Sequence, residues 1–163
     1  MKSIILALGS ALLLSGCLPM AMFAQGGYSG YQSNMGTYVS SGEVNAFCLT
    51  PKLRLAIWSF EGQFGKKVVL NSGYRDNSHN EAAGGMDNSY HKKCMAADFF
   101  IPGVPKEQLI AYARSLDLVG GLGCYPGRSF IHMDVRDRPR GARGPVTFAG
   151  CSGSDGGAPI AQQ

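Results

Sequence analysis

Four cysteines that follow an apolar N-terminal segment are the strongest constraint on how this chain of 163 residues can fold. An even number of cysteines in a short exported protein predicts disulfides, and four cysteines allow three pairings. Two of them, Cys94 and Cys124, lie close in sequence to the candidate site residues described below. We therefore expect Cys94 to pair with Cys124, and Cys48 with Cys151. A zinc site made of these four is disfavoured, because no two are separated by only two to four residues.

The N-terminal segment has the features of a bacterial export signal. Lys2 precedes an apolar run from Ile4 to Leu14, which is too short to span a bilayer comfortably. The four residues that end at Cys17, LSGC, resemble a lipobox, in which this cysteine is lipidated and becomes the first mature residue. The alternative is an ordinary signal peptide cut later, for example after Ala24. We expect residues 1–17 to be a lipoprotein signal and the protein to be lipid-anchored in the periplasm of the bacterial cell envelope.

Composition predicts one small domain and argues against nucleic acid as a partner. Hydrophobic residues make up 45% of the chain and charged residues 16%, as in a globular protein of this size. The net charge of +4 comes from 15 basic and 11 acidic residues without a dense stripe of Lys and Arg. Residues 24–42 are rich in Gly, Ser, Gln and Tyr and lack apolar periodicity, so we expect residues 18–43 to form a flexible tether. We expect a folded domain over 44–151, a disordered tail over 152–163 and a monomer.

Apolar periodicity predicts two helices and four strands. Thr50 can cap a first helix with its side-chain oxygen, Pro51 suits the first helical position, and apolar residues recur at helical spacing up to Phe64. A second amphipathic helix is expected from Pro105 to Leu116. The expected strands are 67–71, 95–101, 122–125 and 130–135, the last two forming a hairpin. A long loop over 72–90 and an irregular stretch after 136 complete the domain.

Two of the three histidines stand near aspartates in the expected strands. His132 and Asp134 are two residues apart, so they point to the same face of a strand. Asp98 on another strand can face the same cleft, with His91 arriving from the loop. Two imidazole nitrogens and one carboxylate oxygen, with a fourth position for water, are a ligand set of catalytic zinc. Ordinary polar histidines and a solvated aspartate are the alternative interpretation of the spacing.

The segment from Val68 to Arg136 resembles the bacterial zinc D-Ala-D-Ala carboxypeptidase-like metallopeptidases, and most closely their exported murein endopeptidases. The resemblance lies in a series of short motifs that occur here in the family's order. These motifs are Ser72-Gly73-Tyr74-Arg75, Gly84-Gly85, Ser89-x-His91, Ala96-x-Asp98 and His132-x-Asp134. The resemblance implies a zinc ion held by His91, Asp98 and His132.

The chain departs from the family at the position of the general base. Several relatives carry Glu or Asp a few residues before the last histidine, but residues 129–131 are Ser-Phe-Ile here. Asp134 is then the remaining candidate for the base, because a carboxylate near a metal-activated water can take its proton. The alternative is that Asp134 orients His132 from behind. Cys94 stands where relatives commonly have glycine, which is compatible with an added disulfide.

Three further polar residues are candidates for contacts with substrate. By the resemblance, Arg75 grips a substrate carboxylate or stabilises an oxyanion. The alternative for Arg75 is a surface ion pair with Asp76 or Asp87. His79 is a candidate for a polar contact with substrate or for a hydrogen bond that stabilises its loop, and Ser89 for a hydrogen bond near the site.

These observations predict an α+β domain with a small, mostly antiparallel sheet, flanking helices, an open zinc cleft and disulfide braces. The implied function is a zinc peptidase that hydrolyses the stem peptides or cross-links of peptidoglycan. An alternative is a zinc-containing lipoprotein that binds peptidoglycan or a protein without hydrolysis, which the missing acid before His132 favours. A purely structural lipoprotein would bind no stoichiometric metal.

Overall fold

The computed structural model describes residues 28–151. The expected signal at residues 1–17, with the lipidation site Cys17, and the expected tail at 152–163 lie outside the described residues. Within the described range, no helix has the length and hydropathy needed to cross a membrane.

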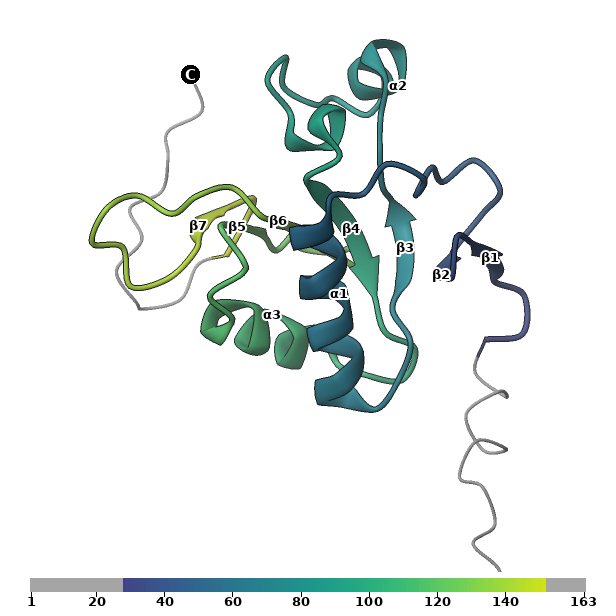
Figure 1. The fold of residues 1–163 in the computed structure, drawn as a ribbon, viewed down its shortest axis with the longest axis horizontal. Helices are drawn as coiled ribbons and strands as arrows, with labels where there is room; N and C mark the ends of the chain where they lie inside the picture. The colour runs from purple at the N-terminus through teal and green to yellow at the C-terminus, as the bar shows by residue number, and fades with distance from the viewer. Residues whose placement is uncertain (1–27, 152–163) are drawn as a thin grey trace, which may run out of the picture.

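Residues 28–151 form an α+β fold, as expected, around one sheet (Figure 1). In space the strands follow the order β1-β2-β3-β4-β6-β5-β7. The strands are β1 (Gln32–Asn34), β2 (Thr37–Val39), β3 (Val69–Ser72), β4 (Ala96–Phe100), β5 (Gly121–Gly123), β6 (Ile131–Asp134) and β7 (Val146–Phe148). The helices are α1 (Pro51–Phe64), α2 (Asn77–Ala82) and α3 (Lys106–Ser115), with a 3-10 turn η3 (Tyr90–Lys93).

The sheet is mixed, so the expectation of a mostly antiparallel sheet is wrong. β2 pairs with β3 in parallel, and β5 pairs with β7 in parallel. The first parallel pair arises because α1 carries the chain back between the two strands, as parallel neighbours require. The second arises because β6 runs antiparallel to β5 and the chain then returns along the other side of β5.

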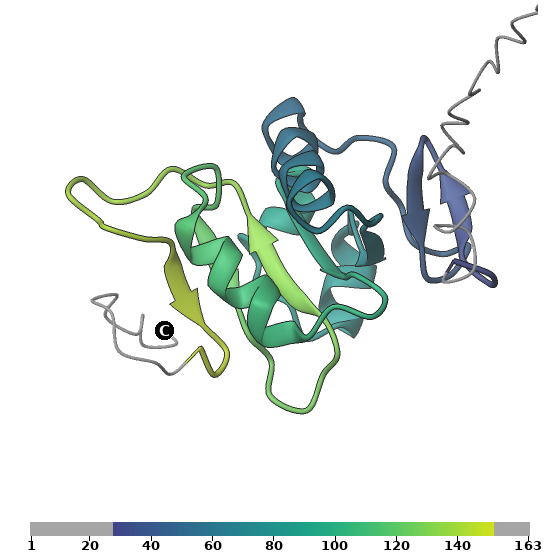
Figure 2. The same ribbon diagram turned by 90° about the horizontal axis from the view of Figure 1, so that it is seen from below.

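Two segments that were expected to be irregular contain strands at the two edges of the sheet (Figure 2). Part of the expected tether, residues 18–43, forms the hairpin of β1 and β2. Its two turn residues, Met35 and Gly36, both have positive φ, as a tight hairpin turn requires. The expected irregular stretch after residue 136 contains β7. The expected loop over 72–90 is also interrupted by α2, whose N-terminus Asp76 caps through its side chain.

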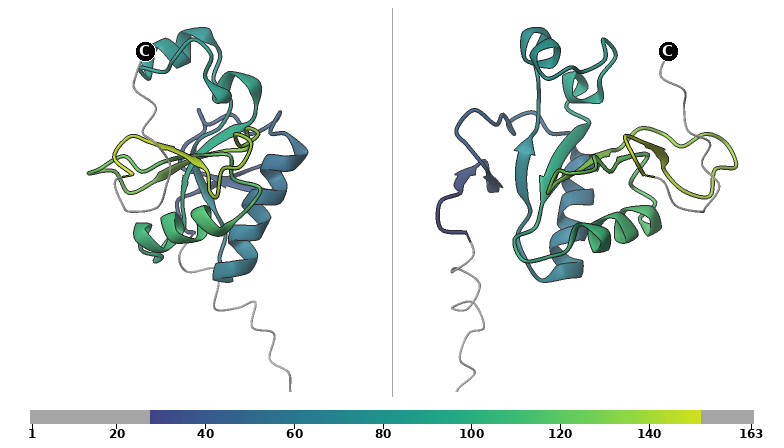
Figure 3. Two further views of the ribbon diagram at one scale, coloured as in Figure 1. Left: turned by 90° about the vertical axis from the view of Figure 1, so that its left-hand side faces the viewer. Right: turned by 180° about the vertical axis from the view of Figure 1, so that it is seen from behind.

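The core joins α1 to the sheet and to α3. Figure 3 shows both helices against the same face of the sheet. The ring of Phe60 on α1 lies 4.9 Å from that of Phe99 on β4 and 4.8 Å from that of Tyr112 on α3. Burying such a ring stabilises the fold by roughly 2–3 kcal/mol. Thr50 takes the expected position before α1, but its hydroxyl makes no capping hydrogen bond.

Residues 28–151 contain two disulfides, and both differ from the expected pairs. Cys48 is bonded to Cys94, and Cys124 is bonded to Cys151. The segment before α1 lies beside the end of η3, where the Thr50 amide donates to the Cys94 carbonyl at 3.0 Å. Cys124 and Cys151 meet because they follow β5 and β7, which are parallel neighbours. Closeness to the candidate site in sequence was therefore the wrong guide to the pairing.

Peptide mapping tests this connectivity. Trypsin separates the four cysteines, because Lys52, Lys93, Arg114 and Arg143 are among the basic residues between them. Non-reducing digestion should yield one linked pair of peptides with Cys48 and Cys94 and another with Cys124 and Cys151, both lost on reduction. Mass spectrometric detection of a link between Cys94 and Cys124 would contradict the fold.

Candidate metal centre

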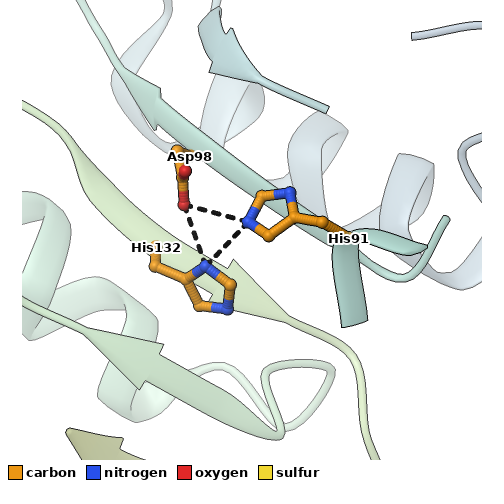
Figure 4. A group of neighbouring side chains, drawn as sticks. All are labelled: His91, Asp98 and His132. Atoms are coloured by element: carbon orange, nitrogen blue, oxygen red, sulfur yellow. Dashed lines mark hydrogen bonds and ion pairs between the residues drawn. The ribbon is translucent and has the colours of Figure 1, made fainter. Parts of the chain in front are cut away.

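Three buried side chains converge on the face of the sheet opposite α1 (Figure 4). Asp98 on β4 and His132 on β6 are register partners, and His91 reaches them from η3. Asp98 Oδ1 lies 2.8 Å from His132 Nδ1 and 3.2 Å from His91 Nε2, and the two nitrogens are 3.1 Å apart. The three residues are between 2% and 6% exposed. The fold thus brings together the three ligands implied by the sequence.

Strand alternation explains why Asp98 and His132 face away from the core. The neighbouring pair in the same ladder, Phe99 and Ile131, is fully buried among the apolar residues. Because successive side chains point to opposite faces, the intervening polar residues lie on the other side. His91 is placed by the turn itself, since Ser89 Oγ accepts a hydrogen bond from the His91 amide at 3.3 Å. The hydrogen bond expected of Ser89 near the site is thus a cap on the η3 turn.

The hydrogen bonds behind the two imidazoles define which nitrogen faces the cluster with a lone pair. His91 Nδ1 lies 2.6 Å from the Gly73 carbonyl, which can only accept, so this nitrogen carries the proton. His132 Nε2 lies 3.2 Å from Asp134 Oδ2, to which it donates. When both rings are neutral, His91 Nε2 and His132 Nδ1 carry no proton, so their lone pairs face each other across 3.1 Å and repel. A metal ion held by His91, Asp98 and His132 would replace this repulsion with coordination, so the donor set fits a metal.

Arg75 is paired with Asp98, a member of the cluster. Its Nη2 contacts Asp98 Oδ2, and its Nε donates to Ser72 Oγ at 2.8 Å. The expected alternatives for an ion pair, Asp76 and Asp87, are therefore not its partners. Burial on its own would raise the pKa of the Asp98 carboxyl, but the hydrogen bonds and positive charge that His132 and His91 supply when protonated outweigh it and hold the pKa well below its usual range. Asp98 is accordingly a carboxylate, as a metal ligand must be.

Asp134 lies behind His132 and is fully buried. Besides His132 it contacts Arg136, whose Nε donates to Asp134 Oδ1 at 2.7 Å. Burial raises the pKa of this carboxyl, but the hydrogen bonds from His132 and Arg136 lower it to about 2. Burial also lowers the pKa of His132, yet the hydrogen bonds to Asp134 and Asp98 raise it. The surroundings of the cluster therefore favour a positive charge at its centre.

Two residues that support this arrangement were missed by the sequence analysis. The guanidinium of Arg136 lies over the ring of Tyr90 at 4.3 Å and that of Phe148 at 5.7 Å. Phe148 also packs on His132, with the ring centroids 5.2 Å apart. Alternation from Asp134 indicates that Arg136 shares its face. Phe148 had no such signal, because its strand was not expected.

His79 does not join the cluster. Its side chain is exposed on α2, and its Nδ1 lies 3.2 Å from Asp76 Oδ2. Its amide donates to Asp76 Oδ1 at 2.8 Å. Of the two interpretations of His79, the contacts support a role in stabilising its own segment. The expected open cleft beside the cluster stays a prediction.

Comparisons with known proteins match the part of the chain that carries the cluster. The Peptidase M15 family model matches residues 31–134. Peptidoglycan L,D-endopeptidase MepK of Escherichia coli K12 is 36% identical over 94 residues, which cover 53% of this chain and 51% of MepK. The probable peptidoglycan L,D-endopeptidase MepK of Haemophilus influenzae is 45% identical over 95 residues, covering 53% of this chain and 50% of that protein.

The chain spans about half the length of the curated relatives it matches. The family match is broader than these alignments within the chain, since it extends from β1 to the last residue of β6. It includes His91, Asp98 and His132, so the cluster falls inside the matched segment. On this match the chain belongs to the Peptidase M15 family.

Proposed function

We propose that this protein is a zinc-dependent peptidase that hydrolyses stem peptides or cross-links of bacterial peptidoglycan. The observation that carries the proposal is the buried cluster of His91, Asp98 and His132, whose ligand atoms all lie within 4.8 Å of one another. Membership of the Peptidase M15 family supports hydrolysis of peptide bonds. The names of the relatives from Escherichia coli and Haemophilus influenzae support peptidoglycan as the substrate.

Zinc suits the donor set and its spacing. Two imidazoles and one carboxylate form a set found in catalytic zinc sites, which keep a further position open. Zinc–nitrogen distances of about 2.0–2.1 Å in a tetrahedral site imply ligand atoms about 3.3 Å apart. The three distances here are 2.8, 3.1 and 3.2 Å. When bound, zinc supplies Lewis acidity that polarises a carbonyl and activates water near neutral pH.

The residues behind the ligands keep them in position for that chemistry. The Gly73 carbonyl fixes the His91 ring, and Asp134 fixes the His132 ring, each through the nitrogen that faces away from the cluster. Arg75 holds the outer oxygen of Asp98, so Oδ1 remains directed at the two histidines. Of the two roles considered for Asp134, we propose the positioning role, because its carboxylate is fully buried and already paired with His132 and Arg136.

The protein would act in the bacterial cell envelope, exported by residues 1–17 and anchored through a lipid on Cys17. Two disulfides support an oxidising compartment such as the periplasm. The anchor would hold a monomeric enzyme beside its polymeric substrate.

One observation favours a second function, a zinc module that binds peptidoglycan peptides without hydrolysing them. Asp134 is committed to His132 and Arg136, and residues 129–131 offer no acid in its place. A site without a free general base would retain affinity and lose turnover. Measured turnover decides between the two functions.

Removal of a ligand should abolish activity. We expect the zinc-loaded protein to release new fragments from purified murein, detected by mass spectrometry, and His132→Ala to reduce the rate at least about 1,000-fold by losing zinc. His79→Ala is the matched control and should retain zinc and activity, because its side chain is exposed and bonded to Asp76. Undiminished product from His132→Ala would exclude the proposed site, and zinc binding without turnover in the parent protein would favour the binding module.

Zinc should stabilise the fold, since the ion binds ligands that only folding brings together. A free zinc concentration about 1,000-fold above Kd adds about 4 kcal/mol to the free energy of unfolding. We therefore expect a chelator to lower the melting temperature by about 10 °C, measured by calorimetry. His91→Ala should show no response to zinc or chelator. An equal response in that variant would mean that the ion binds elsewhere.

The role of Asp134 can be tested through its neighbour Gly121. A Cβ added at Gly121 would lie 2.2 Å from Asp134 Oδ2, so Gly121→Ala must displace the carboxylate from His132. We expect zinc affinity, measured by competition with a chelating dye, to fall about 10- to 100-fold. Gly144→Ala is the control, because nothing lies within 4 Å of its added Cβ. Equal affinities of the two variants would show that Asp134 does not position His132.

A further inference from the structure

Tyr125, between β5 and β6, has a backbone conformation that a tyrosine normally avoids. Its φ is +40°, in the left-handed region that favours glycine. An aromatic residue stays there only where surrounding contacts require it, and such residues are concentrated at functional sites. Tyr125 plays no part in the ligand set described above. Its position therefore needs a separate explanation.

Several contacts hold this residue in place. The Tyr125 amide donates to the Ala149 carbonyl at 2.7 Å. Lys106 Nζ donates to the carbonyls of Cys124 at 3.0 Å, Tyr125 at 3.1 Å and Arg128 at 2.8 Å. The preceding residue, Cys124, is bonded to Cys151. A disulfide, a lysine and a neighbouring strand end thus fix one tyrosine on an otherwise exposed turn.

The ring of Tyr125 extends over Gly123 toward the metal ligands. Gly123 is the register partner of His132 in the ladder of β5 and β6. A Cβ added at Gly123 would lie 3.2 Å from Tyr125 Cε2 and 3.1 Å from the Cβ of His132. Phe148 Cε2 would be closer still, at 2.8 Å, so the absence of a side chain at Gly123 leaves room for the rings of both Phe148 and Tyr125 beside His132. Tyr125 is half-buried.

The electrostatics agree with a phenol close to the cluster. Burial raises the pKa of Tyr125, the carboxylate of Asp98 raises it further, and the guanidinium of Arg75 acts in the opposite direction. Both charges are therefore close enough to act on the phenol. With its pKa raised above the ordinary value of about 10, the phenol keeps its proton at neutral pH and can donate a hydrogen bond.

A second hydrogen-bond donor to the substrate is needed beside the cluster, because two nitrogens of Arg75 are already paired with other residues. Arg75 uses Nη2 on Asp98 and Nε on Ser72. Hydrolysis of an amide develops negative charge on the carbonyl oxygen, and prearranged donors that meet this charge lower the barrier. We propose that Tyr125 is a catalytic residue whose phenol donates a hydrogen bond to the carbonyl oxygen of the scissile bond as that charge develops.

This inference rests on the proposed peptidase function. The phenol keeps its proton throughout, so Tyr125 forms and breaks no covalent bond. The carbonyl carbon gains an oxygen from water and loses the amide nitrogen, which leaves as an amine with a proton from that water. The contribution of Tyr125 is confined to the transition state, where the charge on the carbonyl oxygen is greatest.

The test compares zinc-loaded wild-type protein with Tyr125→Phe on cross-linked disaccharide-peptide dimers prepared from murein. Loss of one such donor should lower kcat about 100-fold and change KM by less than about threefold. Zinc content and melting temperature should match the wild type. Tyr112→Phe is the control, because its hydroxyl donates to the backbone carbonyl of Ser59 at 3.2 Å in the helical layer and takes no part in the cluster. It should retain the wild-type kcat.

Each outcome separates this inference from the function on which it rests. Absence of turnover in the wild type overturns the peptidase function and the inference with it. Turnover by the wild type with an equal kcat in Tyr125→Phe overturns the inference alone, as does a loss that appears only in KM. Should Tyr125→Phe fail to fold, Lys106→Met decides. It keeps the phenol but removes three hydrogen bonds from its turn, so kcat should fall about tenfold, and an unchanged kcat overturns the inference.

Discussion

The antiparallel pairing of β4 with β6 is the interaction on which the rest of the structure depends. It sets Asp98 opposite His132 on one face and Phe99 opposite Ile131 on the other. A slip of one residue would exchange the two faces, moving both polar residues into the core. Burial of Phe99 against Phe60 therefore selects the same register that brings two ligand atoms within 2.8 Å. The same register of β4 and β6 is therefore required both for a stable core and for the geometry of the site.

The second constraint is electrostatic, because the carboxylates of Asp98 and Asp134 are both buried on the face of the sheet that carries His132. A buried charge that loses its partner costs several kcal/mol. Asp98 is matched by Arg75, and Asp134 by Arg136, which is itself held against the ring of Tyr90. Both pairs favour the ionised carboxylate. Arg75 contacts Asp98 Oδ2 and leaves Oδ1 to the histidines, whereas Asp134 Oδ2 is shared by Arg136 and His132. The two histidines can therefore present lone pairs to an ion, while each carries its proton on the far side.

Prediction from the sequence worked where the signal was local. Alternation around Asp98 and His132, helical spacing after Pro51 and the motif order were sufficient for the central strands, for α1 and for the convergence of the ligands. It failed where the structure depends on contacts between distant segments. The hairpin of β1 and β2 lacks an apolar pattern, and β7 is recognisable only once β5 is available as its neighbour. The disulfide pairs were missed for the same reason, since they follow from the path of α1 and β7.

The two disulfides stabilise the site from two separate sides. The bond from Cys48 to Cys94 ties the turn that carries His91 to the segment before α1. The bond from Cys124 to Cys151 ties the far side of the cluster to β7, which supplies the ring packed on His132. The expected pair of Cys94 and Cys124 would have joined the two sides directly. In the observed arrangement no disulfide joins them within residues 28–151, so an ion shared by His91, Asp98 and His132 would itself link the η3 turn to the sheet.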